Sequence, residues 1–225
     1  MTDTKWPDES GGTVDILAID GIDGSGKSTV ARAVIAALSS RGIRAATADR
    51  SGPAAQVAVD GLTTMIKRSD GRLEILDRRA EALVRGARAW QRLAARRQGE
   101  ILVLDRWLVS DLGSISEDAF EAHRAVFEGL IRTTSRGLTI LLDAPFEVTW
   151  SRVSSRPWSD MSPKEQLGRE ANRRVHQEIE TGAARFADCG GVLVRVDARQ
   201  PADRVIDTVL ALLARGGVES VVDPR

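Results

Sequence analysis

The fold is decided by the stretch Gly21-Ile22-Asp23-Gly24-Ser25-Gly26-Lys27-Ser28, which satisfies the pattern G-x-x-x-x-G-K-[ST] of a phosphate-binding P-loop. Its glycines tolerate positive φ and expose backbone N–H groups, so the chain can wrap around an anion. A chance glycine-rich turn is the alternative, but a strand and a helix are predicted on either side, as a P-loop requires. The stretch therefore predicts a nucleoside-triphosphate site, whose binding residues are expected to be Gly21, Asp23, Gly24, Ser25, Gly26, Lys27, Ser28 and Thr29.

The segments on either side of this loop have the patterns of a parallel α/β unit. Residues 14–20 form a short apolar run, typical of a buried parallel strand, and residues 28–38 carry apolar side chains at helical spacing. Such a helix directs the positive end of its dipole at bound phosphates. Within this unit Lys27 is expected to reach the β- and γ-phosphates, and the Ser28 hydroxyl is expected to bind Mg²⁺.

Further apolar runs predict strands at residues 43–48, 101–105, 138–143 and 191–197. Helices are predicted between and after them, over 54–67, 70–97, 116–132 and 146–154, from 162 to about 186, and over 201–214. This alternation predicts an α/β fold with a five-stranded, mostly parallel sheet and helices on both faces. No linker divides residues 13–215, so we expect a single domain there, between flexible tails at 1–12 and 216–225.

Two of the predicted helices carry patterns that can be compared with a structure. Over 70–97, apolar residues step by three and four and predict one buried stripe, made of Leu76, Ala80, Leu83, Val84, Ala87, Trp90 and Ala94. Another face of the same helix is charged, and a solvated surface is its simplest interpretation; it consists of Arg78, Glu81, Arg85 and Arg88. Further along, Ser162-Pro163-Lys164-Glu165 forms a capping box with proline at the first helical position, which predicts a helix start.

The composition limits the classes of protein to which the chain can belong. Lys+Arg and Asp+Glu both number 32 among 225 residues, so the basic excess typical of nucleic-acid-binding proteins is absent. The single Cys189 excludes an internal disulfide and a multi-cysteine metal site. No apolar run reaches the ~20 residues of a membrane span, and the polar N-terminus lacks a signal-peptide core. We expect a cytoplasmic protein with no nucleic-acid or membrane partner; the oligomeric state stays open, with a homodimer as one option.

A second stretch with chemical meaning is Ile101-Leu102-Val103-Leu104-Asp105, four apolar residues that close on an acid. An acid at this place can help to hold Mg²⁺ beside a P-loop. Arg106 follows at once and is expected to point into the same crevice. Around residues 155–166, two helices are joined by a basic irregular segment, as a mobile lid over phosphates would need, and a plain surface turn is the alternative.

Three stretches together resemble the thymidylate kinase family: residues 21–29 (Gly-Ile-Asp-Gly-Ser-Gly-Lys-Ser-Thr), 104–107 (Leu-Asp-Arg-Trp) and 141–145 (Leu-Leu-Asp-Ala-Pro). Order and spacing match over roughly residues 14–215. The resemblance implies a P-loop kinase fold with a short lid and ATP and Mg²⁺ as cofactors. It also implies a small-molecule acceptor, a nucleoside monophosphate, that receives the γ-phosphoryl group of ATP.

The resemblance assigns roles to individual residues. In that family an acid inside the P-loop faces the sugar of the acceptor, as Asp23 would, and Trp107 stands where Tyr or His is usual. Catalytic roles are therefore expected for Lys27, Asp23, Arg106 and Arg156, and metal binding for Ser28 and Asp105. Arg152, at the entry to the lid, would stack near adenine. Arg85 is expected to grip the acceptor phosphate, within an acceptor-binding set of Asp23, Arg50, Glu81, Arg85, Arg106 and Ser110.

The chain departs from the family pattern at three places. Residues 51–54 (Ser-Gly-Pro-Ala) replace Pro-Gly-Gly-Thr, residues 113–114 lack the usual ring, and Glu81 replaces the aromatic residue that stacks on thymine. A carboxylate cannot stack on a base. Glu81 would instead accept from an N–H or amino group of the acceptor, or pair with Arg78 or Arg85. The phosphate-handling half of the site thus matches the family, whereas its base-reading half is altered.

Two other functions compete with nucleotide phosphorylation. A kinase of a hydroxylated, non-nucleotide small molecule would need a base near the acceptor hydroxyl, for which Asp23 is the obvious candidate. A nucleotide-binding switch would hydrolyse or hold ATP without an acceptor. An acceptor phosphate is already nucleophilic and needs only positioning and charge neutralisation, for which the candidates are Mg²⁺, Lys27, Arg85, Arg106 and the lid cations Arg156 and Lys164.

Overall fold

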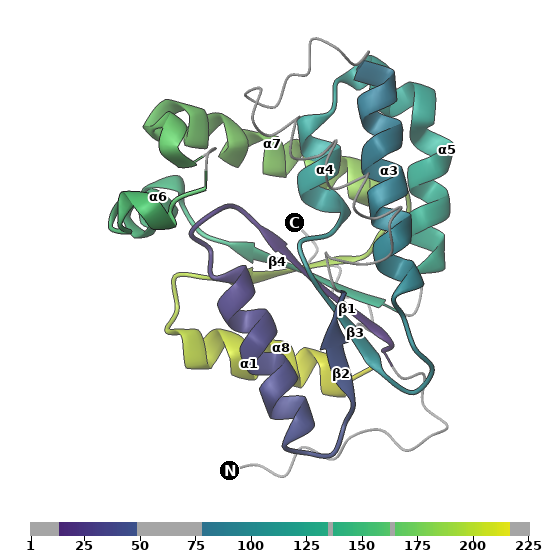
Figure 1. Cartoon of the computed structure of the whole chain (residues 1–225), viewed down its shortest axis with the longest axis vertical. Coiled ribbons are helices and arrows are strands. Elements are labelled where there is room, and N and C mark those ends of the chain that lie inside the picture. The colour runs from purple at the N-terminus through teal and green to yellow at the C-terminus, as the bar shows by residue number, and fades with distance from the viewer. Residues whose placement is uncertain (1–13, 49–77, 135–136, 163–164, 217–225) are drawn as a thin grey trace, which may run out of the picture.

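A five-stranded sheet forms the centre of the molecule, and all of its strands are parallel (Figure 1). The computed structural model describes residues 14–48, 78–134, 137–162 and 165–216. The spatial order of the strands is β2-β3-β1-β4-β5. Their bounds are β1 (Ile16–Gly21), β2 (Ala45–Thr47), β3 (Ile101–Asp105), β4 (Gly137–Asp143) and β5 (Leu193–Asp197). The predicted α/β class and the five-stranded parallel sheet are confirmed.

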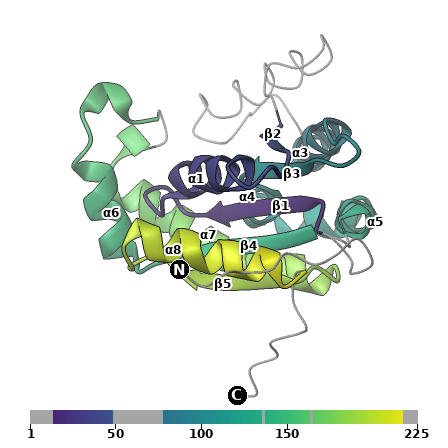
Figure 2. The ribbon, with the colours of Figure 1, turned by 90° about the horizontal axis from the view of Figure 1, so that it is seen from below.

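Helices cover both faces of the sheet and form two separate hydrophobic cores with it (Figure 2). One face, which includes Leu17 of β1, is covered by α1 (Lys27–Ser39) and α8 (Ala202–Ala214). The other face, which includes Ala18, is covered by α3 (Arg78–Ala94), α4 (Leu108–Ser114), α5 (Glu117–Thr133) and α7 (Arg169–Asp188). Because side chains on both faces of β1 are packed in a core, its sequence is a continuous apolar run rather than an alternating one.

The carboxyl ends of β1 and β3 lie side by side. The two strands are parallel neighbours, and Ile19 of β1 pairs with Asp105 at the end of β3. The P-loop follows β1, so the loop and the acid meet at one edge of the sheet. In open parallel sheets this edge is where ligands bind. The same edge is flanked by α6 (Phe146–Ser154), which is followed by the 3₁₀ turns η1 (Trp158–Asp160) and η2 (Glu165–Leu167).

The sequence does not predict α4, because a helix of seven residues shows little periodicity. The helix crosses α7 at very short range. A Cβ atom on Gly113 would lie 2.0 Å from the carbonyl oxygen of Glu178, and one on Gly182 would lie 2.0 Å from that of Val109. The two glycines thus set the separation of the helices, and this packing leaves no room for a ring at residue 113.

The predicted buried stripe of α3 is wrong. Leu83 is 47% exposed and Trp90 is 55% exposed, and Ala87 is exposed between them, whereas Ala82 and Ala89 are buried. The exposed residues line a groove of about 540 Å³ between α3 and α5. Ala82 and Ala89, together with the partly buried Leu93, therefore provide the contact of this helix with the core.

The orientation of α3 follows from its charged face, which is not the solvated surface that spacing alone suggests. Arg85 and Arg88 both reach the carboxylate of Asp111 on α4, which is buried. A buried carboxylate without cationic partners would cost several kcal/mol. The helix therefore directs Arg85 and Arg88 toward Asp111, and Leu83 and Trp90 are left on its exposed side.

The helix start predicted at residues 162–165 is displaced. The capping contacts do form, since the Ser162 N–H donates to Glu165 Oε2 at 2.6 Å and the Glu165 N–H donates to Ser162 Oγ at 3.3 Å. They close only the turn η2, because Gly168, with φ 89°, separates it from α7. Leu167, the last residue of this turn, is 50% exposed.

The other predicted elements that can be compared agree with the structure to within two residues at each end. The helix predicted over 54–67, the first turns of the helix from 70, and Arg50 lie outside the described residues, as do both tails except Gly216. Among the helices that the structure describes, none is long and apolar enough to cross a membrane.

Candidate active site

The P-loop connects β1 to α1 and encloses its own lysine. Gly24, with φ 86°, turns the loop against α6 so closely that a Cβ atom would lie 2.4 Å from the Thr149 carbonyl oxygen. Lys27 is 5% exposed, and its ammonium group donates to the Ile22 carbonyl oxygen at 2.5 Å. The lysine is thus held at the N-terminal end of α1, where the helix dipole favours an anion.

The environment of Lys27 weakens its hold on the proton. Burial, and next the charge of Arg106, lower the pKa of Lys27 to about 8, although the nearby carboxylates of Asp23, Asp20 and Asp105 act in the opposite direction. A cation that has lost hydration in this way gains most when an anion replaces the missing water. These are the electrostatic conditions of a phosphate site.

The two predicted metal-binding residues lie in contact. The Ser28 hydroxyl donates to Asp105 Oδ2 at 2.6 Å and so joins the P-loop to the end of β3. Hydroxyl and carboxylate oxygens suit Mg²⁺, which commonly uses one or two protein ligands and completes its shell with phosphate and water. In the part of the chain that the structure describes, no three His, Cys, Asp or Glu side chains form a metal cluster. The oxygen atoms of Ser28 and Asp105 fit such a partial set of Mg²⁺ ligands.

Asp23 and Arg106 face each other across the cleft. Arg106 Nη2 donates to Asp23 Oδ1, and the same oxygen lies 3.8 Å from Lys27 Nζ. Arg106 has φ 72° and is, within the described ranges, the one non-glycine residue with positive φ. Such a conformation costs roughly 1–3 kcal/mol and persists only where the surrounding structure enforces it. The structure thus brings together three of the four predicted catalytic residues.

Sequence reasoning missed Arg92, near the end of α3. Its Nη1 donates to the carbonyl oxygen of Arg106 at 2.5 Å, and its Nη2 donates to that of Asp105 at 2.9 Å. The signal was present in the spacing, since one more step of four along the charged face of the helix leads from Arg88 to Arg92. The residue therefore belongs to the site as a contact of the turn after β3.

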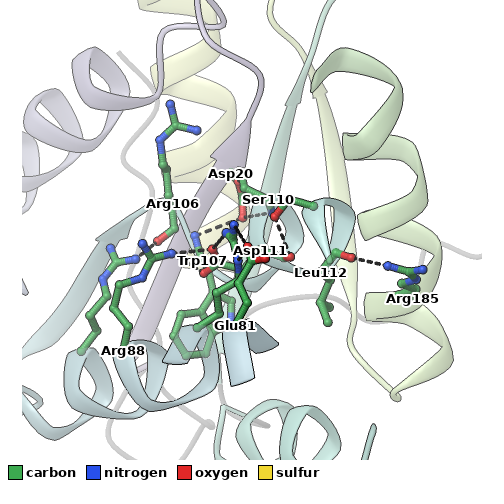
Figure 3. Close-up of polar contacts among 12 residues, drawn as sticks. Asp20, Glu81, Arg88, Arg106, Trp107, Ser110, Asp111, Leu112 and Arg185 are labelled. Atoms are coloured by element: carbon green, nitrogen blue, oxygen red, sulfur yellow. Dashed lines mark hydrogen bonds and ion pairs between the residues drawn. The ribbon is translucent and has the colours of Figure 1, made fainter. Parts of the chain in front are cut away.

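Sequence reasoning also missed Asp20, which is completely buried at the end of β1. Its carboxylate accepts from the N–H groups of Gly21 at 3.0 Å and Trp107 at 3.0 Å, and from the N–H and hydroxyl groups of Ser110 at 3.3 and 2.5 Å (Figure 3). Asp20 thereby supplies the cap that α4 lacks locally. The Ser110 hydroxyl serves this contact, and its role toward an acceptor stays a prediction.

Glu81, Arg85, Arg88 and Asp111 form a largely buried ionic cluster between α3 and α4, which we call the α3–α4 cluster. Figure 3 shows Glu81, Arg88 and Asp111 of this cluster. Arg88 Nη2 lies 2.5 Å from both carboxylate oxygens of Asp111, and Arg85 Nη1 lies 2.9 Å from one of them. Burial would raise the pKa of Asp111, but Arg88 and Arg85 outweigh it and hold that pKa at about 2. The Asp111 carboxylate is therefore charged throughout the physiological range.

In the α3–α4 cluster Glu81 forms one of the two contacts predicted for it, and its contact with an acceptor stays a prediction. Its Oε1 accepts from Arg85 Nε at 2.9 Å and from Nη2 at 2.6 Å, so the carboxylate pairs with Arg85. Burial would lower the pKa of Arg85, but Asp111 and Glu81 outweigh it and raise that pKa above its ordinary value. The structure directs the Arg85 guanidinium to these two carboxylates, and its expected grip on an acceptor phosphate stays a prediction.

The residues predicted for the lid lie at the other side of the cleft. Arg152 Nη1 donates to the Gly24 carbonyl oxygen at 3.3 Å, which ties α6 to the P-loop. Arg156 Nη1 donates to Glu165 Oε1 at 2.7 Å and is 40% exposed. Arg50 and Lys164 lie outside the described residues. Together, P-loop, β3 turn and lid segment enclose a cavity of about 770 Å³, lined among others by Asp23, Lys27, Ser28, Asp105, Arg106 and Arg156.

A parallel sheet that carries a P-loop beside an acid-ended strand, with arginines converging on one cavity, places the chain among the P-loop phosphotransferases. The model of the thymidylate kinase family matches residues 19–209, which is most of the chain. The chain belongs to the thymidylate kinase family, and it is a nucleoside monophosphate kinase-like phosphotransferase.

Solved structures show the same fold. One structure of a deoxyadenosine kinase from M. mycoides, with bound dCTP, matches with a TM-score of 0.55 at 17% identity and covers 89% of this chain and 99% of that one. A second structure of that enzyme, with the products dCMP and a flexible dCDP, gives a TM-score of 0.55 at 18% identity, covering 89% and 98%. A third, with dATP, gives 0.53 at 18% identity, covering 88% and 98%. At this identity the likeness establishes the fold.

Proposed function

We propose that this protein transfers the γ-phosphoryl group of ATP to the phosphate of a nucleoside monophosphate, with Mg²⁺ as cofactor. The observation that carries the proposal is the contact of Ser28 with Asp105 at 2.6 Å, beside the buried Lys27 in one cavity. The bound Mg²⁺ would supply positive charge that neutralises the phosphate oxygens, and Ser28 and Asp105 would hold it.

The protein's own groups then have defined tasks. The backbone N–H groups of the P-loop and the N-terminal end of α1 bind the donor phosphates, and Lys27 stabilises charge that develops on the transferring group. Arg106 lines the same cavity and would neutralise the acceptor phosphate. Arg156 is the candidate lid cation; it would have to exchange Glu165 for a phosphate. Closure of residues 155–166 over the phosphates is part of this proposal.

The position of Asp23 favours a phosphate acceptor over a hydroxyl acceptor. Arg106 donates to its carboxylate, and Lys27 lies 3.8 Å away. The carboxylate of Asp23 is therefore already engaged with two cationic neighbours. A hydroxyl acceptor needs a base to remove its proton, whereas a phosphate acceptor carries a nucleophilic oxygen already. Asp23 is therefore better suited to hold Arg106, and to meet the acceptor sugar, than to remove a proton.

The test is a panel of acceptors, each offered with ATP and Mg²⁺ to the purified protein. The panel pairs every common nucleoside monophosphate, ribo and deoxy, with its nucleoside, and includes a reaction without acceptor. Separation of the products by ion exchange should show a diphosphate formed from at least one monophosphate, and no diphosphate with the Lys27→Ala variant. A product from nucleosides alone would overturn the phosphate acceptor. ATP hydrolysis that is independent of any acceptor would instead indicate a nucleotide switch.

A further inference from the structure

The turn after β3 presents both of its chemically important side chains from a conformation that needs support. Asp105 contacts Ser28, and the next residue, Arg106, contacts Asp23. Arg106 adopts φ 72°, a region that disfavours residues with a Cβ atom. A change of the Arg106 backbone to a negative φ would move the Asp105 carboxylate and the Arg106 guanidinium together. The reason is that the peptide units on either side of Arg106 join these two residues to the rest of the turn.

Arg92 contacts both of those peptide units. Its two terminal nitrogens donate to the carbonyl oxygens of Asp105 and Arg106, at 2.9 and 2.5 Å. A planar guanidinium group with two parallel donors fixes a pair of acceptors in a way that a single ammonium group cannot. The arginine itself is carried by α3, which the α3–α4 cluster holds in place one and two turns earlier.

A second side of the turn is held independently. The Arg106 N–H donates to the Ile19 carbonyl oxygen at 2.9 Å, and the Trp107 N–H donates to the Asp20 carboxylate at 3.0 Å. These contacts fix the N–H groups of the turn from β1, whereas Arg92 fixes its carbonyl groups from α3. Arg92 is the group that the helix contributes to this arrangement.

We propose that Arg92 is a positioning residue for phosphoryl transfer: its guanidinium clamps the carbonyl groups of Asp105 and Arg106, and thereby aims the carboxylate at Ser28 and the Arg106 guanidinium at Asp23. The inference rests on the proposed function of this site. It assigns to Arg92 no contact with the transferred group; Arg92 acts through the two residues that it holds.

The clamp and the simple charge of Arg92 have different consequences. Arg92 borders the cavity, so its charge could also draw anions into it. Arg92→Lys keeps that charge but loses the two parallel donors, whereas Arg92→Ala loses both. If Arg92 is a clamp, the two variants behave alike. Arg96 provides a matched control, because it follows α3 and pairs with the Asp15 side chain at 2.9 Å instead of with the turn.

The first experiment measures kcat and KM for donor and acceptor with the wild type, Arg92→Ala, Arg92→Lys and Arg96→Ala. We expect kcat to fall about a hundredfold in both Arg92 variants, since misplacement of reacting groups by about 1 Å costs this much. The KM of ATP should change less than threefold, and Arg96→Ala should match the wild type. Guanidinium ions at millimolar concentration should restore part of the kcat of Arg92→Ala. Full activity of Arg92→Lys would overturn the clamp in favour of charge alone.

A double-mutant cycle separates positioning from a general loss of structure. Because Arg92 acts partly through Arg106, Arg92→Ala should reduce kcat much less in an Arg106→Ala background than in the wild type. Equal reductions in both backgrounds would overturn the proposed route through Arg106. Thermal unfolding of all variants provides the control for folding.

Hydrogen–deuterium exchange tests the clamp without any activity. Exchange of the peptide that spans residues 104–110 should accelerate in Arg92→Ala and stay at the wild-type rate in Arg96→Ala. Unchanged exchange in Arg92→Ala would overturn the clamp even if the enzyme is active. If exchange accelerates but the wild type phosphorylates no acceptor, the clamp holds and the proposed function fails, so the two failures are distinguishable.

Discussion

The P-loop site and the α3–α4 cluster both hold buried charges, but they treat them in opposite ways. At the P-loop, burial lowers the pKa of Lys27 to about 8 although carboxylates lie nearby. In the α3–α4 cluster, two arginines outweigh burial and hold the pKa of Asp111 at about 2. A buried cation that holds its proton weakly is prepared for an incoming anion, whereas a buried carboxylate with two cationic partners serves the fold. Burial thus leaves the charge at the P-loop weakly held, whereas the charge pairs of the α3–α4 cluster compensate one another.

Removal of the P-loop lysine should have the largest effect on activity and leave the stability of the fold intact. Lys27→Ala is expected to reduce phosphoryl transfer by a factor on the order of 10³ or more, because its charge meets the transferring phosphates. The free energy of unfolding should stay the same or rise slightly, since a desolvated charge is removed. Steady-state kinetics and urea unfolding measure the two quantities. Normal turnover in a folded Lys27→Ala protein would contradict the assignment of the ATP site.

Removal of the cluster carboxylate should lower the stability of the fold. Asp111→Ala leaves Arg85 and Arg88 buried near each other without their shared partner, and we expect the free energy of unfolding to drop by about 3–5 kcal/mol. The exposed Asp207 on α8 gives a matched control, whose change to Asn should lie within about 0.5 kcal/mol of the wild type. Chemical denaturation of both variants checks this; a stable Asp111→Ala protein would show that the cluster does not hold α3 to α4.

The pH dependence of kcat/KM for ATP should show a smaller effect, which tests the lowered pKa of Lys27. Above pH about 8, kcat/KM for ATP should fall up to tenfold per pH unit, because the free enzyme loses the Lys27 proton. Saturating ATP should shift this limb to higher pH, since phosphate favours the charged lysine. A kcat/KM profile that stays flat to pH 10 would contradict the lowered pKa of Lys27.

Lys27 and Asp111 also make the free energy of unfolding depend on pH, each in a different pH range. The pKa of Lys27 is lowered by folding, so the unfolded chain binds more protons between pH 8 and about 10.5, and this group makes the fold more stable as pH rises there. The pKa of Asp111 is lowered too, but for an acid the contribution is present above pH about 4 and is lost as pH falls toward 2. Unfolding free energies measured at several pH values test both signs.

The sequence predicts the P-loop region well because its determinants are local. Eight consecutive residues specify the loop, and an apolar run that ends on Asp105 specifies the neighbouring strand. Parallel pairing of β1 with β3 then brings Ser28 and Asp105 together without further information. The rule that ligands bind at the carboxyl ends of parallel strands then places the site at this edge of the sheet.

The α3–α4 region could not be predicted in the same way, because its determinants come from distant parts of the chain. The orientation of α3 depends on Asp111, which lies on a helix too short to show a period. The apolar pattern of Leu83 and Trp90 indicated the opposite face. The role of Asp20 could not be predicted from the sequence either, because its partners Trp107 and Ser110 reach it only after the sheet has formed.

The central place of β1 in the sheet has a consequence for biosynthesis. Its partners are β3 and β4, so Ile16 pairs with Leu102 on one side and with Gly137 on the other. A ribosome adds roughly 5–20 residues per second, so this strand waits on the order of ten seconds for both neighbours. During that time its two apolar faces and unpaired backbone must be shielded by chaperones or by transient collapse. The loop that binds the nucleotide is therefore synthesised early and becomes competent late, when residues more than a hundred positions away have arrived.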